Sequence, residues 1–466
     1  MTKWDPHPLP TSGPLYRRIA DALARDVEDG TLTPRTRLPT HRSLAKELGV
    51  NVMTVTRAYA EASRRGLLEA RVGRGSFVRG PRDATDRPVD RPFGVSDARI
   101  DLAFNLPAGE CPFEAPDALS AISADRLACL LDRGYATVGL PEHRTTGVHW
   151  LARAGVKTTQ DRILVTAGAQ HAMTVAFATL LRPGDALLTE SATYAGTRAV
   201  AEILGLRPVG VKVDADGLVP DDLERVVVDS GARVLYIQPT ISNPTGTVQP
   251  EDRRREVVAI CRRHDVRVVE DDSYGFLHRA PPPPIAALAP ERTFYLTSLS
   301  KSLASGLRVG WLSVPETRNT EALVTRAAGH VAALAWAASP LTAELATRFI
   351  DDGTADARVS TKRRETTARQ KLARTVLGEL GDSDPASCHI WYPLPAPWRA
   401  DDFVAQAALR DVVVSAPGPF CVDPNARPNR VRICLGTPAT RAEVKEGLEV
   451  LAMLLDDTPR SLGPIV

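Results

Sequence analysis

A lysine flanked by hydroxyl and guanidinium groups is the first chemical feature of the chain. Lys301 lies in the run Ser298-Leu299-Ser300-Lys301, and Arg308 follows seven residues later. A lysine amine can form an imine with an aldehyde, while a hydroxyl and a guanidinium can hold a phosphate group. A lone Ser-x-x-Lys run is more often a surface loop, so the prediction of a site for a phosphate-bearing aldehyde depends on the rest of the chain.

Further polar groups come directly after segments that are predicted to be strands. Four apolar runs show this pattern: residues 163–166 precede Gly168-Ala169-Gln170, residues 186–190 precede Tyr194, residues 234–237 precede Asn243, and residues 266–270 precede Asp271 and Tyr274. Strand-like and helix-like segments alternate from about residue 100, which is typical of an α/β fold with a mainly parallel sheet. Such sheets bind ligands at the carboxyl ends of their strands. Taken singly, each residue could be a helix cap, a plain turn or a surface cation.

In this order, the motifs resemble the fold-type I aminotransferases over about residues 100–455. The resemblance implies that the chain binds pyridoxal 5′-phosphate, with Lys301 as the Schiff-base lysine. Asp271 would face the pyridinium nitrogen, and Tyr194 would stack on the ring. Asn243 and Tyr274 would donate hydrogen bonds to the phenolic oxygen. The phosphate would be held by five residues, namely Gly168, Ala169, Gln170, Ser298 and Arg308.

Three further residues are assigned in the same region. Arg432, in Val431-Arg432-Ile433-Cys434, matches the arginine that grips a substrate carboxylate bidentately. Tyr135 matches a tyrosine that reaches the phosphate of the neighbouring subunit, which implies a homodimer. His389, close to Trp391, is expected to be structural.

The first 80 residues are more basic than the rest of the chain. They carry 14 Lys and Arg against eight Asp and Glu, while the whole chain has a net charge of +2. This charge favours a polyanionic partner, although solvated arginine-rich faces are common. Apolar residues at helical spacing predict a helix from about Leu15 to Val27, and two short helices follow, with Thr40 and Asn51 as caps. The third helix would bury the face with Val52, Val55, Tyr59 and Ala62, and residues 67–71 and 75–78 would form a hairpin.

The run Leu38-Pro39-Thr40-His41-Arg42-Ser43-Leu44-Ala45, followed by Gly73-Arg74-Gly75-Ser76-Phe77-Val78, resembles the winged-helix domain of the GntR family. The resemblance implies binding to double-stranded DNA, with the third helix in the major groove and the hairpin at the minor groove. The candidate contacts are Arg42, Asn51, Met53, Thr54, Arg57 and Arg74. Arg42 and Arg74 would mostly meet the backbone or the minor groove, whereas Asn51, Met53 and Arg57 would read base edges. The family often has arginine where this chain has Val52, so its base contacts cannot simply be copied.

Composition places the protein in a broad class. With 43% hydrophobic and 24% charged residues, the chain is typical of a soluble globular protein. No apolar run approaches the roughly 20 residues that span a bilayer, and no signal peptide opens the chain, so a cytoplasmic protein without a membrane partner is expected. Six cysteines without CxxC spacing predict neither a disulfide framework nor a metal site. The expected domains are a head at 1–79, a linker at 80–98 and a body at 99–466, the body divided into a large part (about 135–340) and a small part (about 341–460).

A GntR head joined to an aminotransferase-like body resembles the MocR (GabR-like) subgroup of bacterial transcription regulators. The resemblance implies a head-to-tail homodimer on operator DNA that senses pyridoxal phosphate, a small amine or an amino acid through an aldimine at Lys301. One alternative is a working aminotransferase with an accessory head, because the set of cofactor residues is complete. Another is a regulator that senses pyridoxal phosphate alone.

Overall fold

The chain divides into two compact units, Met1–Phe93 and Gly94–Val466. The computed structural model describes residues 4, 6, 14–29, 31–33, 36–64, 67–71, 75–78, 100–108, 115–133 and 136–457. The expected linker at 80–98 and the candidates Arg74 and Tyr135 lie outside these residues. No helix within the described ranges is long and apolar enough to cross a membrane.

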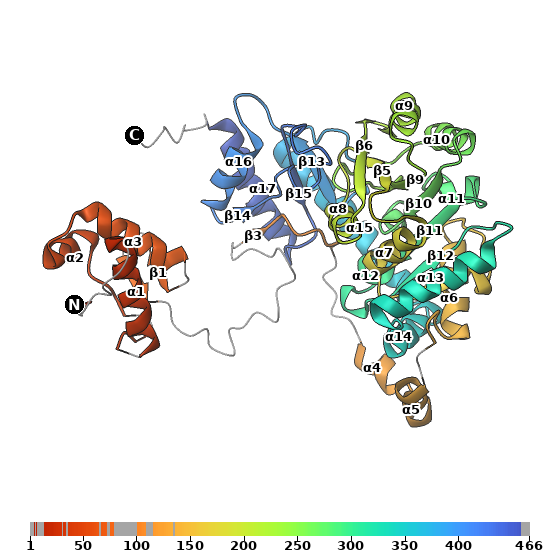
Figure 1. The fold of residues 1–466 in the computed structure, drawn as a ribbon, viewed down its shortest axis with the longest axis horizontal. Coiled ribbons are helices and arrows are strands. Elements are labelled where there is room, and N and C mark those ends of the chain that lie inside the picture. The colour runs from red at the N-terminus through yellow and green to blue at the C-terminus, as the bar shows by residue number, and fades with distance from the viewer. Residues whose placement is uncertain are drawn as a thin grey trace. The chain divides into compact units, whose positions relative to one another are not determined.

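The described part of the smaller unit contains three helices and an antiparallel hairpin, drawn in red to orange in Figure 1. These elements are α1 (Leu15–Glu28), α2 (His41–Leu48), α3 (Val52–Arg64), β1 (Leu68–Arg71) and β2 (Gly75–Val78). Apolar side chains from all three helices and both strands meet in one core, including Ile19, Leu23, Leu44, Tyr59 and Val78. The helical spacing of these residues in the sequence therefore does define the buried faces.

Predicted caps fix the starts of α2 and α3. The Ser43 amide donates to Thr40 Oγ1 at 3.2 Å, and the Met53 amide donates to Asn51 Oδ1 at 2.8 Å. Gly49 ends α2 in the left-handed conformation, with φ of 66°. Because these contacts satisfy backbone groups that a helix end leaves open, they confirm the predicted turn between the two helices.

The smaller unit differs from the sequence prediction in two places. Val52 was expected on the buried face of α3, but it is 40% exposed because it opens the helix, one turn before the core begins at Val55. Residues 36–38 also pair with β2: Leu38 N–H donates to Ser76 O and Val78 N–H donates to Thr36 O, both at 2.9 Å. This third strand-like segment attaches the hairpin to the start of α2.

The larger unit is built on a seven-stranded sheet with the order β4-β12-β11-β10-β9-β5-β6. Its strands are β4 (Ile163–Thr166), β5 (Ala186–Glu190), β6 (Arg207–Val211), β9 (Val234–Ile237), β10 (Arg267–Asp271), β11 (Thr293–Ser298) and β12 (Gly310–Ser313). All neighbours are parallel except β12, which is antiparallel to both β4 and β11. The predicted mainly parallel α/β sheet is confirmed, and four of its strands coincide with the apolar runs in the sequence.

Helices cover both faces of this sheet, which explains why its strands are apolar throughout. One face packs against α7 (Ala169–Leu180), α8 (Ala195–Ile203) and α13 (Thr320–Ala335). The other packs against α6 (Pro141–Ala152), α9 (Pro220–Ser230), α10 (Glu251–Arg263), α11 (Ile285–Leu288) and α14 (Pro340–Asp351). Shorter elements connect them: α4 (Ala115–Ser120), α5 (Ala124–Arg133), η1 (Gln160–Arg162), β7 (Val213–Asp214), β8 (Gly217–Leu218), η2 (Gly275–Leu277), α12 (Leu299–Ser302) and η3 (Ser305–Leu307).

A C-terminal subdomain follows, drawn in blue in Figure 1. It comprises α15 (Thr354–Leu377), β13 (His389–Pro393), α16 (Ala400–Ala408), β14 (Val412–Val413), β15 (Arg430–Cys434) and α17 (Arg441–Asp456). The first strand of the larger unit, β3 (Ile100–Asp101), pairs with β14, and Ile100 and Leu102 belong to the core of this subdomain. The pairing places residues 103–108 next to β15, a position that the order of the sequence alone did not indicate.

A buried guanidinium joins several loops at the carboxyl edge of the sheet. Arg254 of α10 is fully buried and donates to five oxygens: the carbonyls of Pro239, Gln249, Pro282 and Pro283, and Thr240 Oγ1. A buried charge is costly unless it is fully hydrogen-bonded, so these loops depend on the planar fork of arginine.

We therefore expect Arg254→Lys to lower the free energy of unfolding of the larger unit by about 2 kcal/mol or more, because an ammonium group leaves several buried carbonyls without a donor. Urea unfolding followed by tryptophan fluorescence measures the change. Arg255→Lys, on an exposed position of the same helix, is the matched control and should stay within about 0.5 kcal/mol of wild type. Equal effects of both substitutions would contradict this role of Arg254.

Candidate functional site

Lys301 occupies the one-turn helix α12, directly after the end of β11. Its ammonium nitrogen donates to the carbonyl of Asn105, and its own carbonyl accepts a 2.8 Å hydrogen bond from the buried Lys362. Burial lowers the pKa of the Lys301 amine, since the charged form loses solvation. A larger neutral fraction makes the amine a better nucleophile towards a carbonyl group.

Three of the predicted phosphate-binding groups surround one small space. Gly168 has φ of 90°, and a Cβ atom placed there would lie 3.0 Å from Arg308 Nη2 and 3.6 Å from Ser298 Oγ. Ala169 and Gln170 open α7, so their amides belong to the free first turn of a helix. Within the described residues, the buried Gln170 Oε1 has no hydrogen-bond partner. The space has the donors and the positive charge that a phosphate requires.

Asp271, at the end of β10, is a buried carboxylate surrounded by donors. It accepts hydrogen bonds from the hydroxyls of Tyr236 (2.8 Å) and Ser273 (2.6 Å), from the Ser273 amide (3.0 Å) and from Gln238 Nε2 (3.1 Å). Burial raises the pKa of Asp271, while these hydrogen bonds oppose the rise. Burial also raises the pKa of Tyr194, with a further contribution from the Asp271 charge. The structure therefore brings Tyr194 and Asp271 into one electrostatic environment.

Asn243 and Arg432, which are far apart in the sequence, contact each other directly. Arg432 Nη1 donates to Asn243 Oδ1 at 2.8 Å, and Arg432 Nη2 donates to the carbonyl of Ala103 at 2.7 Å. The guanidinium also lies 4.5 Å from the ring centroid of Phe420. Its buried Nε has no hydrogen-bond partner in the described part of the chain. An arginine held in this way keeps donor capacity for a carboxylate.

Asn105 is a site residue that the sequence analysis missed. Its Nδ2 donates to the Tyr274 hydroxyl at 3.1 Å and to His389 Nδ1 at 3.2 Å, and its Oδ1 accepts from the Cys388 thiol. Because Nδ1 accepts, the His389 proton lies on Nε2, which donates to Ser242 O at 3.0 Å. Burial lowers the pKa of His389 to about 3, so the ring is neutral. The sequence held one indication of this role, since Asn105 is a single polar residue between Phe104 and Leu106 in an apolar run.

Glu190, at the end of β5, is the second residue that the sequence analysis missed. It is fully buried and accepts from the Ser242 hydroxyl at 3.1 Å and from the Gln238 amide at 3.4 Å. Its pKa is raised to about 8, mainly by burial and to a lesser extent by the charge of Asp271. The sequence held one indication of this role, since Glu190 is a charged residue at the end of an otherwise apolar strand. Gln238, which contacts both acids, links Glu190 to Asp271.

The predicted residues of the larger unit thus gather at the carboxyl edge of β4, β5, β9, β10 and β11, with Tyr135 outside the described residues. In the smaller unit, Arg42, Asn51, Met53 and Arg57 are exposed, Thr54 is half-buried, and Arg74 is outside the described residues. Two of the exposed residues, Met53 and Arg57, lie on α3, on the side away from its buried Val55 and Tyr59.

Comparisons with known protein families match both units. The family "Aminotransferase class I and II" matches residues 102–451, and the family "Bacterial regulatory proteins, gntR family" matches residues 15–78. These matches agree with the resemblances that the motifs indicated, and they account for nearly all of the described chain.

Individual proteins similar to this chain include regulators and an aminotransferase. The chain is 31% identical to YdeF, an uncharacterized HTH-type transcriptional regulator of Bacillus subtilis (strain 168), over 97% of both chains. It is 29% identical to PdxR, the HTH-type pyridoxine biosynthesis transcriptional regulator of Corynebacterium glutamicum, over 67% of this chain and 68% of the relative. A solved structure of kynurenine aminotransferase from Pyrococcus horikoshii, in complex with PMP, is similar with a TM-score of 0.70 at 26% identity, covering 78% of this chain and 91% of that chain.

The raised pKa of Glu190 predicts a pH-dependent contribution to stability. Below the ordinary pKa of 4.5 the carboxyl is protonated in both states, and between 4.5 and about 8 only the folded state keeps the proton. The stabilising proton is thus fully present below pH 4.5 and is lost as the pH rises through about 8. Glu190→Gln imitates the protonated carboxyl, so its free energy of unfolding relative to wild type should increase from about pH 5 to about pH 8. Urea unfolding at several pH values measures this difference.

Glu202→Gln, on an exposed position of α8, controls for the loss of one negative charge. A Glu190→Gln protein whose stability follows wild type at every pH would show that Glu190 is ionised in the fold throughout this range.

Proposed function

We propose that this chain, which belongs to the aminotransferase class I and II family and carries an N-terminal domain of the bacterial gntR regulator family, is a transcription regulator. Its DNA binding responds to a ligand at the site formed by Lys301 and the polar residues around it, which we call the Lys301 cleft. The ligand is pyridoxal 5′-phosphate, or a small amine or amino acid that reacts with the bound cofactor. The observation that carries the proposal is the presence, in one chain, of an exposed α3 face and a cleft with a buried lysine of lowered pKa.

The cleft fits pyridoxal phosphate by its own chemistry. When bound, this cofactor supplies an aldehyde and an electron-withdrawing ring. Gly168, Ser298 and Arg308 would hold its phosphate, since the Arg308 guanidinium and the Ser298 hydroxyl lie directly beside the Gly168 backbone at the start of α7. Asp271 would hold the proton of the ring nitrogen, and Lys301 would provide the covalent attachment.

Two side chains are oriented as donors by contacts inside the protein. Arg432 occupies Asn243 Oδ1, which leaves Asn243 Nδ2 available to donate. The Asn105 amide donates to the Tyr274 oxygen, which leaves the Tyr274 hydroxyl hydrogen available. Both groups are therefore prepared to meet an acceptor, as the phenolic oxygen of the cofactor requires. Neither orientation depends on the cofactor itself.

Arg432 defines the ligand class that we propose for the cleft. Its unpartnered Nε would complete a second contact to a carboxylate, which favours an amino acid over a simple amine. Such a ligand can shift DNA binding only if it binds two arrangements of the protein with different affinity. We also propose that the working unit is a homodimer, in which Tyr135 of one subunit completes the cleft of the other and two α3 helices read two half-sites.

A second function is favoured by one specific observation. Lys301 is buried and its pKa is lowered by that burial, so its neutral amine could serve as a base for the α-proton of an amino acid. The chain could therefore act as an aminotransferase that carries an accessory DNA-binding head.

The first test concerns the lysine. Lys301→Ala should remove the visible absorption band that bound pyridoxal phosphate adds to the protein, because no other amine lies in its place. Lys362→Met, which changes the neighbouring buried lysine, is the matched control and should keep the band. A band that persists in Lys301→Ala and disappears in Lys362→Met would assign the attachment to Lys362 instead.

The second test measures DNA binding. The purified protein is titrated by fluorescence anisotropy against the DNA upstream of its own gene and of the divergent neighbour. The titration is run without cofactor, with pyridoxal phosphate, and with the cofactor plus a panel of amino acids and amines. We expect site-specific, salt-sensitive binding that changes with one ligand. Arg57→Ala should weaken binding by about 1–3 kcal/mol if the side chain reads a base.

The outcomes separate the candidate functions. A change caused by pyridoxal phosphate alone identifies a sensor of vitamin B6 supply. A change that also needs an amino acid identifies that amino acid as the effector. Absence of specific binding in every condition, together with steady transamination of a panel member, would replace the regulator by the aminotransferase.

A further inference from the structure

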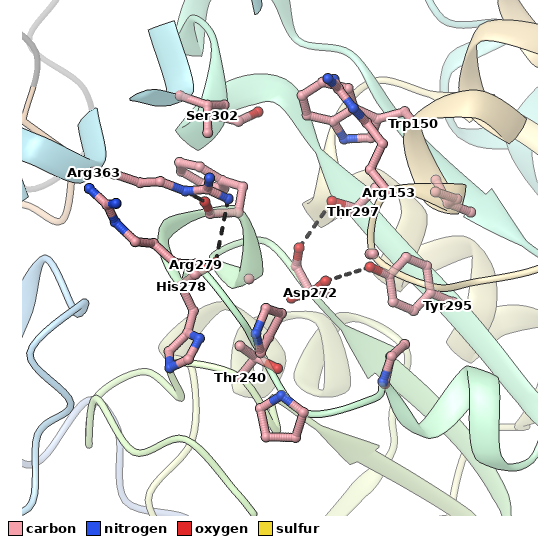
Figure 2. Close-up of a pocket in the computed structure, with 18 of the residues that line it drawn as sticks. Trp150, Arg153, Thr240, Asp272, His278, Arg279, Tyr295, Thr297, Ser302 and Arg363 are labelled. Carbon is pink, nitrogen blue, oxygen red and sulfur yellow. Dashed lines mark hydrogen bonds between the residues drawn. The ribbon is translucent and has the colours of Figure 1, made fainter. Parts of the chain in front are cut away.

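A separate cavity of about 260 Å³ lies beside α6, between the loop that follows β10 and the first turns of α15. Figure 2 shows Arg279 and Arg363 on one side of this cavity, Trp150 and Arg153 on the other, and Asp272 between them. Among the residues that the structure describes, none of those assigned to the cofactor lines it. We call it the Trp150 cavity.

The Trp150 cavity lies across the sheet edge from the cofactor residues. Successive side chains of a strand point to opposite faces, and β11 shows this alternation. Phe294 and Leu296 pack against α7, whereas Tyr295 packs in the core that contains α6 and donates its hydroxyl to Asp272. Asp272 is therefore turned away from the cleft in which the preceding Asp271 lies.

The walls of the Trp150 cavity carry an excess of positive charge. Arg153 lies 5.0 Å above the Trp150 ring and pairs with Asp356, whereas Arg279 is exposed and has no ion pair among the described residues. Arg363 is held in place because its Nε donates to the carbonyl of Phe276 at 2.6 Å. Burial lowers the pKa of Arg363, and the positive charges of Arg279 and Arg153 lower it further. Asp356 already pairs with Arg153, so Arg279 and Arg363 are the guanidinium groups that an anion in the cavity would neutralise.

Neutral groups complete the lining. Ser302 is 1% exposed, and its hydroxyl has no hydrogen-bond partner in the described ranges. It lines the Trp150 cavity from the side of α12 and is available to donate or to accept. Trp150 and the side chains of Pro281 and Pro282 provide flat apolar surface. A ligand that matches this lining has one anionic group and a small flat apolar body.

We propose that the Trp150 cavity is a binding site for a small aromatic anion, a carboxylate or a phosphate monoester, whose charged group pairs with Arg279 and Arg363. The ring of the ligand lies against Trp150 and the prolines. This site is distinct from the cofactor cleft and does not depend on bound pyridoxal phosphate.

The Trp150 cavity and the Lys301 cleft are connected through the backbone, because neighbouring residues of the same segments belong to each. Four residues of its lining directly adjoin residues assigned to the cofactor in the sequence: Thr297 precedes Ser298, Ser302 follows Lys301, Asp272 follows Asp271, and Gly275 follows Tyr274. α15 contributes Asp356 and Arg363 to the lining and then continues into the C-terminal subdomain. A bound anion would therefore join the sheet edge to the helix that leads to β13 and β15.

The test is a calorimetric titration of the full-length protein with benzoate, with phenyl phosphate and with the neutral benzamide. We expect both anions to bind and benzamide not to bind at the same concentrations. Arg279→Ala should weaken the binding of the anions by about tenfold and Arg279→Glu should abolish it, because a charge-assisted pair is lost and then reversed. Since Arg279 is exposed, both variants should fold normally.

Arg207→Ala, at the exposed start of the edge strand β6, is the matched control and should bind as wild type does. Arg432→Gln should also keep the affinity for benzoate, which separates the Trp150 cavity from the carboxylate group of the cleft. The relative affinity of the two anions identifies which chemistry the site prefers. Unchanged affinity in both Arg279 variants, loss of binding in Arg432→Gln, or equal binding of benzamide would each overturn the proposal.

Discussion

Asp271 is a carboxylate buried at the end of a parallel strand, where an ionised group is costly unless several donors compensate for the lost solvation. Tyr236, Gln238 and Ser273 provide those donors. Gln238 also contacts Glu190 and, through its Oε1, the Asn243 amide. The requirement to satisfy one buried charge thus fixes the ends of β5, β9 and β10 relative to one another.

A second set of contacts is centred on Asn105 and Arg432. Asn105 connects the segment after β3 with Tyr274 and His389 through its side chain, and with Lys301 through its own carbonyl, which accepts from the lysine ammonium group. Arg432 connects β15 with Asn243 and with the carbonyl of Ala103. In both cases a polar contact inside the protein uses one side of an amide or hydroxyl group and leaves the other side open. These internal contacts fix the orientation of the Asn243 amide and the Tyr274 hydroxyl.

Because successive side chains of a strand point to opposite faces of the sheet, two neighbouring residues can lie in different environments. Asp271 is surrounded by hydrogen-bond donors on one face of the sheet edge, whereas Asp272 contacts Tyr295 on the opposite face and lines the Trp150 cavity. Ser298 and Thr297 are divided in the same way, with Thr297 donating to the carbonyl of Asp272 at 3.0 Å. Such a sheet edge can carry two chemically distinct sites within a few residues of sequence, because each site uses only one face.

The sequence by itself determined the two-part architecture, the parallel sheet and most of the cleft, because periodicity, caps and strand-end motifs are local signals. The Thr40 and Asn51 caps, the strand at 186–190 and the placement of Asp271 at a strand end all follow from neighbouring residues. Only the tertiary structure decided which distant segments meet. Asn105 and Glu190 gained their partners through chain segments dozens to hundreds of residues away, and the Pro281–Pro282 loop became a cavity wall through its packing near α15. Val52 shows the same limit in the head, since a position at helical spacing is buried only where another element covers it.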